Sequence, residues 1–234
     1  MTALALVVGG TSGIGRKIAS TLFSRGEDVV ITGRDLARAE SVSNEIGKTV
    51  SGLALDLTQP KEIARAVREL GQIDHLLLTA VERDRNSVRA YDIERAMRAV
   101  MLKLVGYTEV VHALSKQFAP DASIVIQGGM ARDRPYPGST SISMINGGVS
   151  SMVRTLAIEL APVRVNAVHP GAVGDSPALS GVASPAFIES IRARTPTGRL
   201  VTMENVADAV VMLLDNPDLN GVNLNVDGGF LLTT

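Results

Sequence analysis

The sequence has no cysteine and no tryptophan, and aromatic residues make up only 3% of its 234 positions. Without cysteine the chain has neither disulfide bonds nor thiolate chemistry, which fits a reducing compartment. The three histidines, His75, His112 and His169, lack the spacing of metal ligands, so we expect no metal site. No apolar run reaches the roughly 20 residues that a membrane span needs. These absences favour a soluble cytoplasmic protein that does not bind a membrane.

The sequence also lacks an excess of charge of either sign. Lysine and arginine number 23 and aspartate and glutamate 24, which leaves a formal net charge of −1. A chain this close to neutrality is not expected to bind nucleic acid or another polyanion. Hydrophobic residues make up 45% of it and charged residues 20%, as in a folded domain. The length favours a single domain, residues 1–234.

Short β-branched runs alternate with helical patterns along the whole chain. They cover residues 4–8, 28–32, 74–78, 123–127, 163–168 and 221–226, and a weaker seventh run lies near 50–55. Such alternation is typical of repeated βαβ units. The sequence therefore predicts an α/β fold, with a buried parallel sheet of seven strands and helices on both of its faces.

Two helices are well marked by their apolar spacing. Ile14, Ile18 and Leu22 fall on one helical face, and Arg25-Gly26 indicates where that helix ends. After residue 141 apolar residues recur at spacings of three and four, so one side of this helix is core or a subunit interface. These residues are Ile142, Ile145, Val149, Met152, Val153, Leu156 and Leu160.

Residues 171–200 form the one long segment with weak periodicity, and they are rich in glycine and proline. A loop of this length inside a compact domain tends to be a lid or a binding loop. We therefore interpret residues 171–200 as a substrate or lid loop. A mobile surface excursion is the alternative.

A glycine-rich stretch, "VVGGTSGIGR", follows the first strand directly and opens the first helix. Glycine is needed where a turn takes positive φ and where backbone approaches a pyrophosphate, and free N–H groups at the helix start face the anion. The order strand, loop, helix makes a dinucleotide cradle the preferred interpretation over a structural turn. Its expected residues are Gly9, Thr11, Ser12, Gly13, Ile14 and Gly15.

The second strand ends in "VITGRD", which bears on the choice of cofactor. NAD is usually recognised there by an acidic residue that binds the ribose, whereas a 2′-phosphate suits a guanidinium. Arg34 at this position favours NADP(H) over NAD(H). Against this, Asp35 follows at once, and Arg34 has an alternative as an ordinary solvated residue at a helix start.

Four segments resemble the short-chain dehydrogenase/reductase family, and the likeness runs over nearly the whole chain. They are "GGTSGIG" (9–15), "LDL" (55–57), "VRTLAIELAPVRVNAVHPGAV" (153–173) and "LNVDGG" (224–229). The resemblance implies a Rossmann-type, doubly wound sheet, a nicotinamide cofactor, a small-molecule substrate, and a homotetramer or homodimer. It also adds cofactor-binding positions: Asp56 and Leu57 by the adenine, Thr79 after the fourth strand, Asn146, and Pro170, Gly171 and Val173 at the carboxamide.

The same resemblance makes the catalytic helix unusual. In the family a tyrosine gives or takes the proton, and a lysine one helical turn later lowers its pKa and binds the ribose. These residues fall at Ile142 and Asn146. The family's serine falls at Gly128 or Gly129, and its supporting asparagine falls at Lys103. The threonine after the Pro-Gly turn is Asp175.

Four side chains are candidates for the lost acid–base chemistry. Tyr136 and Arg132 belong to the loop after the fifth strand. The alternative is that this loop is an ordinary solvated loop without a catalytic role. Asp175 is a proton donor if apolar cover raises its pKa, or else caps a short helix in "DSPALS". Lys103 points to the active site as the family's asparagine does, or is a surface lysine. His169 is expected to be a buried, hydrogen-bonded histidine rather than a catalytic one.

Three functions remain open. The first is an NADP(H)-dependent oxidoreductase with a non-standard proton relay, or one whose substrate needs little protonation, such as a charged imine. The second is a catalytically inactive cofactor-binding protein or partner subunit. The third is an isomerase, dehydratase or cyclase that uses the same pocket. Fold-level analogy favours the first, and the altered site favours the other two.

Overall fold

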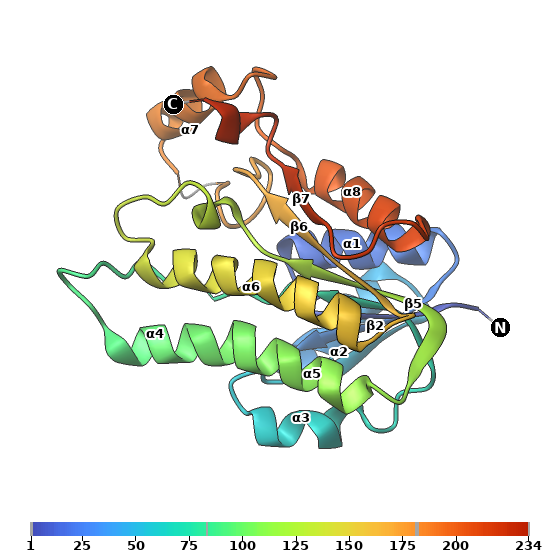
Figure 1. The fold of residues 1–234 in the computed structure, drawn as a ribbon. Helices are drawn as coiled ribbons and strands as arrows, with labels where there is room; N and C mark the ends of the chain where they lie inside the picture. The colour runs from blue at the N-terminus through green and yellow to red at the C-terminus, as the bar shows by residue number, and fades with distance from the viewer. Residues whose placement is uncertain (1, 83, 181–182, 234) are drawn as a thin grey trace.

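The fold is described by a computed structural model, which covers residues 2–82, 84–180 and 183–233. Its seven strands form one parallel sheet in the order β3-β2-β1-β4-β5-β6-β7. Figure 1 shows the sheet with helices around it. The strands are β1 (Leu4–Val8), β2 (Asp28–Gly33), β3 (Val50–Ala54), β4 (Ile73–Leu78), β5 (Phe118–Gln127), β6 (Arg164–Pro170) and β7 (Asn223–Val226). The predicted Rossmann-type, doubly wound sheet of seven strands is confirmed.

The order of the strands reverses between β1 and β4. Val8 at the end of β1 lies beside Thr32 of β2 on one side and beside Leu78 of β4 on the other. From β1 the chain first adds strands in one direction and, after β3, in the other. In open α/β sheets such a reversal leaves a crevice at the carboxyl ends of the two central strands. The sheet itself therefore sets where a ligand binds.

Helices cover both faces of the sheet. Leu6 and Val8 of β1 belong to one apolar cluster, with residues of α3, α5 and α6, whereas Ala5 and Val7 belong to the other, with residues of α1, α2 and α8. Burial on both sides explains why β1 is continuously apolar. The helices are α1 (Gly13–Ser24), α2 (Leu36–Ile46), α3 (Pro60–Val67), α4 (Ile93–Val100), α5 (Gly106–Leu114), α6 (Thr140–Glu159), α7 (Pro185–Arg194) and α8 (Met203–Asp215).

Helices α4 and α5 are joined by a π-helical turn, η1 (Met101–Val105), so that helical backbone runs without a loop from one to the other. Gly106 directly follows this turn. A Cβ atom at Gly106 would lie 2.6 Å from the carbonyl oxygen of Leu57, so glycine lets the helix approach the chain that leaves β3. π-Helical turns are rare and often mark functional positions.

The segment 171–200 differs from the loop that its sequence predicts, because it contains α7. No residue of α7 is buried, so the helix produces no apolar periodicity for a sequence pattern to detect. Figure 1 shows α7 next to the end of the chain, and the hydroxyl of Thr233 donates to the carbonyl oxygen of Arg194. Gly181, which contributed to the weak periodicity, lies outside the described residues. Within the described residues, no helix is both long and apolar enough to cross a membrane.

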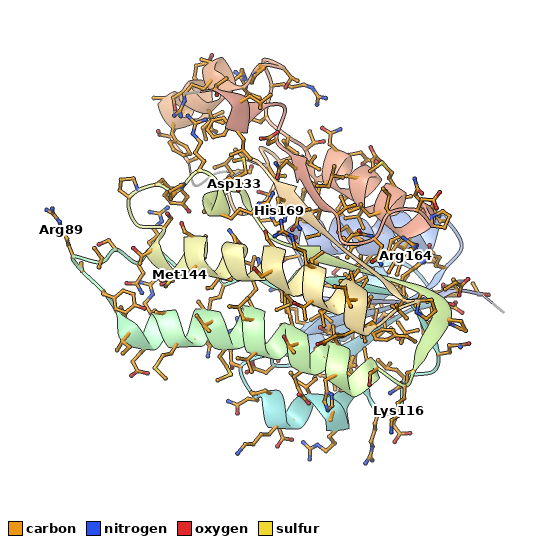
Figure 2. The ribbon with its side chains drawn as sticks, in the orientation of Figure 1. Arg89, Lys116, Asp133, Met144, Arg164 and His169 are labelled. Carbon is orange, nitrogen blue, oxygen red and sulfur yellow. The ribbon has the colours of Figure 1, made fainter. Side chains whose placement is uncertain are left out.

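Arg164, at the start of β6, binds the end of α8 to the sheet. Its Nη1 donates to the carbonyl oxygens of Leu213 (2.8 Å) and Leu219 (3.2 Å), and its Nη2 donates to that of Leu214. The last carbonyls of a helix lack partners within it, and a cation there also opposes the helix dipole. Figure 2 shows Arg164 and His169 toward opposite ends of β6, so this contact is remote from the crevice.

We expect Arg164→Met to lower the free energy of unfolding by about 2 kcal/mol, because three carbonyl oxygens lose a charged donor. Urea denaturation followed by circular dichroism measures this difference. Arg154→Met is the matched control, since Arg154 is exposed on α6. Equal stability of the two variants would show that the Arg164 contacts do not hold α8.

Candidate active site

A cleft of about 520 Å³ opens at the carboxyl ends of the central strands. Every residue predicted to hold the cofactor lines this cleft, except Asn146. The residues of that set that line it are Gly9, Thr11, Ser12, Gly13, Ile14, Gly15, Arg34, Asp56, Leu57, Thr79, Pro170, Gly171 and Val173. The structure thus gathers residues from five separate segments of the chain into one site.

The glycine loop lies against the end of β4. Gly9 has a φ of +87°, and a Cβ atom there would lie 2.6 Å from the Cα of Ala80. A Cβ atom at Gly15 would lie 2.3 Å from the carbonyl oxygen of Gly9 and 2.5 Å from the hydroxyl of Thr79. That hydroxyl in turn donates to the carbonyl oxygen of Val8 at 2.9 Å. Both glycines are required by close packing, and Thr79 ties the loop to β4.

The N-terminus of α1 opens into the cleft without a cap of its own. Ser12 is the N-cap residue, yet its side chain makes no capping hydrogen bond, and the first turn holds no acidic residue. The first N–H groups of a helix have no intrahelical acceptor and attract anions. This end of the cleft is therefore suited to a phosphate group.

The charged side chains at the end of β2 have separate roles. Arg34 is exposed and lines the cleft. The carboxylate of Asp35 instead accepts a hydrogen bond from the backbone N–H of Arg38 at 2.7 Å and so caps α2. Across the cleft, the carboxylate of Asp56 accepts from the N–H (2.9 Å) and the hydroxyl (2.7 Å) of Thr58. Arg34 is left as the charged group that faces a ligand at the end of β2.

His169 is fully buried near the end of β6 (Figure 2). Its Nδ1 accepts the N–H of Gly129 at 3.1 Å, so the proton lies on Nε2, which donates to Asn223 at 2.9 Å. Burial is the largest cause that lowers the pKa of His169, to about 4, and the nearby cations Arg132 and Lys103 also lower it. The hydrogen bond to Asn223 raises this pKa, but by less than burial lowers it. The expectation of a buried, hydrogen-bonded histidine is confirmed.

His169 and Asn146 fill the space beside the two glycines that follow β5. A Cβ atom at Gly128 would lie 2.2 Å from Nδ1 of His169, and one at Gly129 would lie 2.8 Å from Nδ2 of Asn146. Asn146 is buried beneath this turn and is not among the residues that line the cleft. Neither glycine can be replaced by a residue with a side chain unless these two neighbours move.

Residues 8–231 match a protein family described as enoyl-(acyl carrier protein) reductase. The chain belongs to the short-chain dehydrogenase/reductase family. Carbonyl reductase family member 4 of Xenopus laevis is 30% identical over 241 residues, which cover 99% of each chain. A solved 3-ketoacyl-(acyl-carrier-protein) reductase from Brucella melitensis, complexed with NADH, is 28% identical with a TM-score of 0.85 over 98% of each chain.

A second solved structure has a different description. The MalC reductase/Diels-Alderase from Malbranchea aurantiaca is 25% identical, with a TM-score of 0.90, and the match covers 99% of this chain and 97% of that one. The family resemblance drawn from the four sequence segments is confirmed by these likenesses. The family is one of oxidoreductases that bind a nicotinamide cofactor in a Rossmann-type fold.

None of the four candidate acid–base residues is among the residues that line the cleft. Tyr136 is 56% exposed, and Arg132 donates to the hydroxyl of Ser150 (2.7 Å) and to Oδ1 of Asn225 (3.0 Å). Arg132 thereby ties the turn η2 (Met130–Arg132) to α6 and β7. The short helix expected in "DSPALS" is absent from its described residues, which form turns, and Asp175 accepts the N–H of Met203 at the start of α8 (2.9 Å). The expectation that Asp175 caps a helix of its own was therefore wrong.

Lys103, the fourth candidate, is buried in η1 with 5% of its surface exposed. The alternative of a surface lysine was wrong. Its ammonium forms no ion pair with another described residue, and burial lowers its pKa to about 8. The neighbouring Leu102 lines the cleft. A buried, unneutralised ammonium is costly to the fold and is a common sign of function.

Some cleft residues are not apparent from the sequence. The end of β5 contributes Gln127, whose Oε1 is buried without a partner, and the chain after β4 contributes Glu82, bound by Arg98 at 2.9 Å. Ser176, Pro177, Ala178 and Leu179 also line the cleft, from the segment that was expected to be a lid. The position of Gln127 at a strand end was the one available signal, because carboxyl ends of parallel strands meet at the ligand.

The stability of the protein is expected to depend on pH through Lys103. Below pH 8 both folded and unfolded chains carry the ammonium, whereas between about 8 and 10.4 the folded chain releases its proton first and gains stability. Relative to Lys103→Met, the wild type should therefore gain about 3 kcal/mol between pH 7 and pH 10.5. Urea denaturation across this range measures the gain. Parallel curves for the two proteins would contradict a buried ammonium.

Proposed function

We propose that this protein is an NADP(H)-dependent oxidoreductase that moves a hydride between the cofactor and a small carbonyl compound, with acid–base chemistry unlike that of its family. The observation that carries the proposal is the cleft itself. It combines an uncapped helix N-terminus, two glycines that allow close approach and an exposed arginine at the end of β2. This set suits a dinucleotide that carries a 2′-phosphate.

The residues present fit such a cofactor along its whole length. The N–H groups at the start of α1 would hold the pyrophosphate, and Asp56 would lie by the adenine. Pro170, Gly171 and Val173 would hold the nicotinamide carboxamide at the other end of the cleft. The cofactor supplies the hydride when bound. The chain's own part is to orient it and to keep the reacting face away from water.

The preference for NADP(H) rests on the contrast between Arg34 and Asp35. An acidic residue at the end of β2 would favour the free ribose hydroxyls of NAD(H). Asp35 is engaged in capping α2, whereas the guanidinium of Arg34 is exposed at the cleft. A planar guanidinium binds phosphate by two parallel hydrogen bonds.

The altered chemistry rests on what occupies the family's catalytic positions. Ile142 and Asn146 stand on α6 where the family has tyrosine and lysine, and His169 and Asn146 fill the space of a serine after β5. Acid–base catalysis and an oxyanion donor together are worth roughly 6–9 kcal/mol of transition-state stabilisation. An active reductase with these residues therefore needs its proton from another group.

A non-redox reaction is the second candidate, and one observation favours it. The MalC structure, which superimposes with a TM-score of 0.90, is described as both a reductase and a Diels-Alderase. A cyclisation needs a shaped pocket and no proton donor, which matches the loss of the tyrosine and lysine. A cofactor-binding protein without catalysis is the third candidate, and it predicts binding alone.

The assembly we propose is a homo-oligomer formed through the long helices. Met97 of α4, Met144 and Ile158 of α6, and Val105 of η1 expose 59%, 55%, 80% and 43% of their surface. Exposed apolar side chains on neighbouring helices are typical of a subunit interface. A second copy of the chain would cover them.

A fluorescence titration with NADPH and NADH, followed by a panel of carbonyl, enone and imine compounds, tests the function. We expect NADPH to bind and to be oxidised by a carbonyl compound, because the cleft fits the cofactor and Arg34 its phosphate. Binding without oxidation by any compound would favour the non-redox or inactive alternatives. Absence of binding by either cofactor would overturn the proposal.

The substitution Arg34→Asp tests the preference for NADP(H) over NAD(H). NADPH affinity should fall about 100-fold, since a charged hydrogen-bonded pair worth about 3 kcal/mol is replaced by a repulsive one, while NADH affinity stays within about threefold. Isothermal titration calorimetry gives both constants. Arg38→Asp on the exposed side of α2 is the matched control and should change neither. Equal losses for both cofactors in the Arg34 variant would refute the assignment.

A further inference from the structure

We propose that Lys103 is the acid–base residue of this site, and that its ammonium, carried on the helix that faces α6, gives the proton to the substrate's carbonyl oxygen. The inference rests on the proposed function, since it names the proton donor that a reductase with this α6 requires. It is argued from where the backbone of η1 places Lys103, from what surrounds its ammonium, and from the partner residue on α6.

The two neighbours of Lys103 fix the direction of η1. Leu102 lines the cleft, and Leu104 packs on α6, where a Cβ atom at Gly148 would lie 3.0 Å from its methyl groups. Gly106 holds the same helix against Leu57, which also lines the cleft. Lys103 itself is not among the lining residues; it starts from backbone between Leu102 at the cleft and Leu104 at α6, and its side chain is buried there.

The surroundings of the ammonium include a buried histidine and charged groups of both signs, since Asp133 as well as Arg132 acts on the pKa of His169. Lys103 and Arg132 both lower the pKa of His169, so the three side chains lie within electrostatic reach of one another. His169 in turn touches Gly128 of the cleft lining. From α5, the hydroxyl of Tyr107 is committed to the carbonyl oxygen of Ala80. Since Arg132 is hydrogen-bonded elsewhere, Lys103 is left as the buried group here that can release a proton near neutrality.

Lys103 and Asn146 stand as an exchanged pair. By the resemblance, position 146 on α6 belongs to a lysine and position 103 to an asparagine, and this chain has the two residue types reversed. The exchange keeps one ammonium and one amide on the two neighbouring elements α6 and η1. The amide of Asn146 now lies against Gly129, beneath the turn after β5, and the ammonium has moved to the opposite helix.

The resulting step is balanced. The carbonyl carbon accepts the hydride from the reduced nicotinamide, the C=O π bond breaks, and the oxygen takes a proton from Lys103, which gives an alcohol, oxidised cofactor and a neutral amine. Water returns the proton to the amine. A fixed ammonium repels a cationic iminium, so the site favours a neutral carbonyl compound over the charged imine.

The affinities of oxidised and reduced cofactor provide a test that needs no substrate. The oxidised nicotinamide ring is cationic and the reduced ring is neutral, whereas the 2′-phosphate is common to both. A charged Lys103 beside the ring therefore weakens NADP⁺ relative to NADPH. Calorimetric titrations between pH 6.5 and 9.5 measure the ratio of the two dissociation constants. His169, with a pKa of about 4, does not titrate in this range.

In the wild type we expect the ratio Kd(NADP⁺)/Kd(NADPH) to fall about tenfold as pH rises through 8. In Lys103→Met, a change of similar volume, the ratio should be low and constant, and in Lys103→Arg high and constant. Lys116→Met, at the far end of α5 (Figure 2), is the matched control and should follow the wild type.

Two results would overturn the assignment of Lys103. One is a ratio in the wild type that does not change with pH, and the other is an unchanged pH dependence in Lys103→Met. Failure of the wild type to bind either cofactor would instead refute the proposed function, so the two failures are distinguishable. Thermal unfolding of each variant verifies that it is folded before the titration.

Discussion

The arrangement of the site depends on how closely the loop between β1 and α1 approaches the end of β4. A Cβ atom at Gly9 or at Gly15 would lie within 2.6 Å of atoms of Ala80 or of Gly9 itself, so larger residues would force the two strand ends apart. β1 and β4 are the strands between which the sheet reverses. This contact therefore sets the floor of the cleft, and it also fixes the direction of α1 and of the N–H groups at its start.

Patterns within one segment predicted most of the fold. The seven strands lie where the β-branched runs lie, and α6 follows the apolar spacing after residue 141, because burial of a strand or of a helix face imposes a period on the sequence. Where burial is missing, so is the signal. The helix α7 has no buried residue, and the segment around it was expected to be a loop.

The site was predictable in part for a related reason. The phosphate loop and Arg34 each follow a strand directly, and their position at the cleft follows from chain order. The packing of His169 under Gly128 and of Asn146 against Gly129 joins residues that are distant in the sequence. The burial of Lys103 also depends on the tertiary fold, since a lysine in an apolar stretch fits the surface equally well.

The lack of buried residues in α7 has a consequence for the order in which parts of the fold open. Local opening requires little free energy where little apolar surface becomes exposed to water. Helix α7 has no buried residue. Near it, the guanidinium groups of Arg134 and Arg194 lie 4.4 and 5.1 Å from the ring centre of Phe230. Opening of α7 is therefore expected to cost less free energy than opening of α6, which has buried residues along its length.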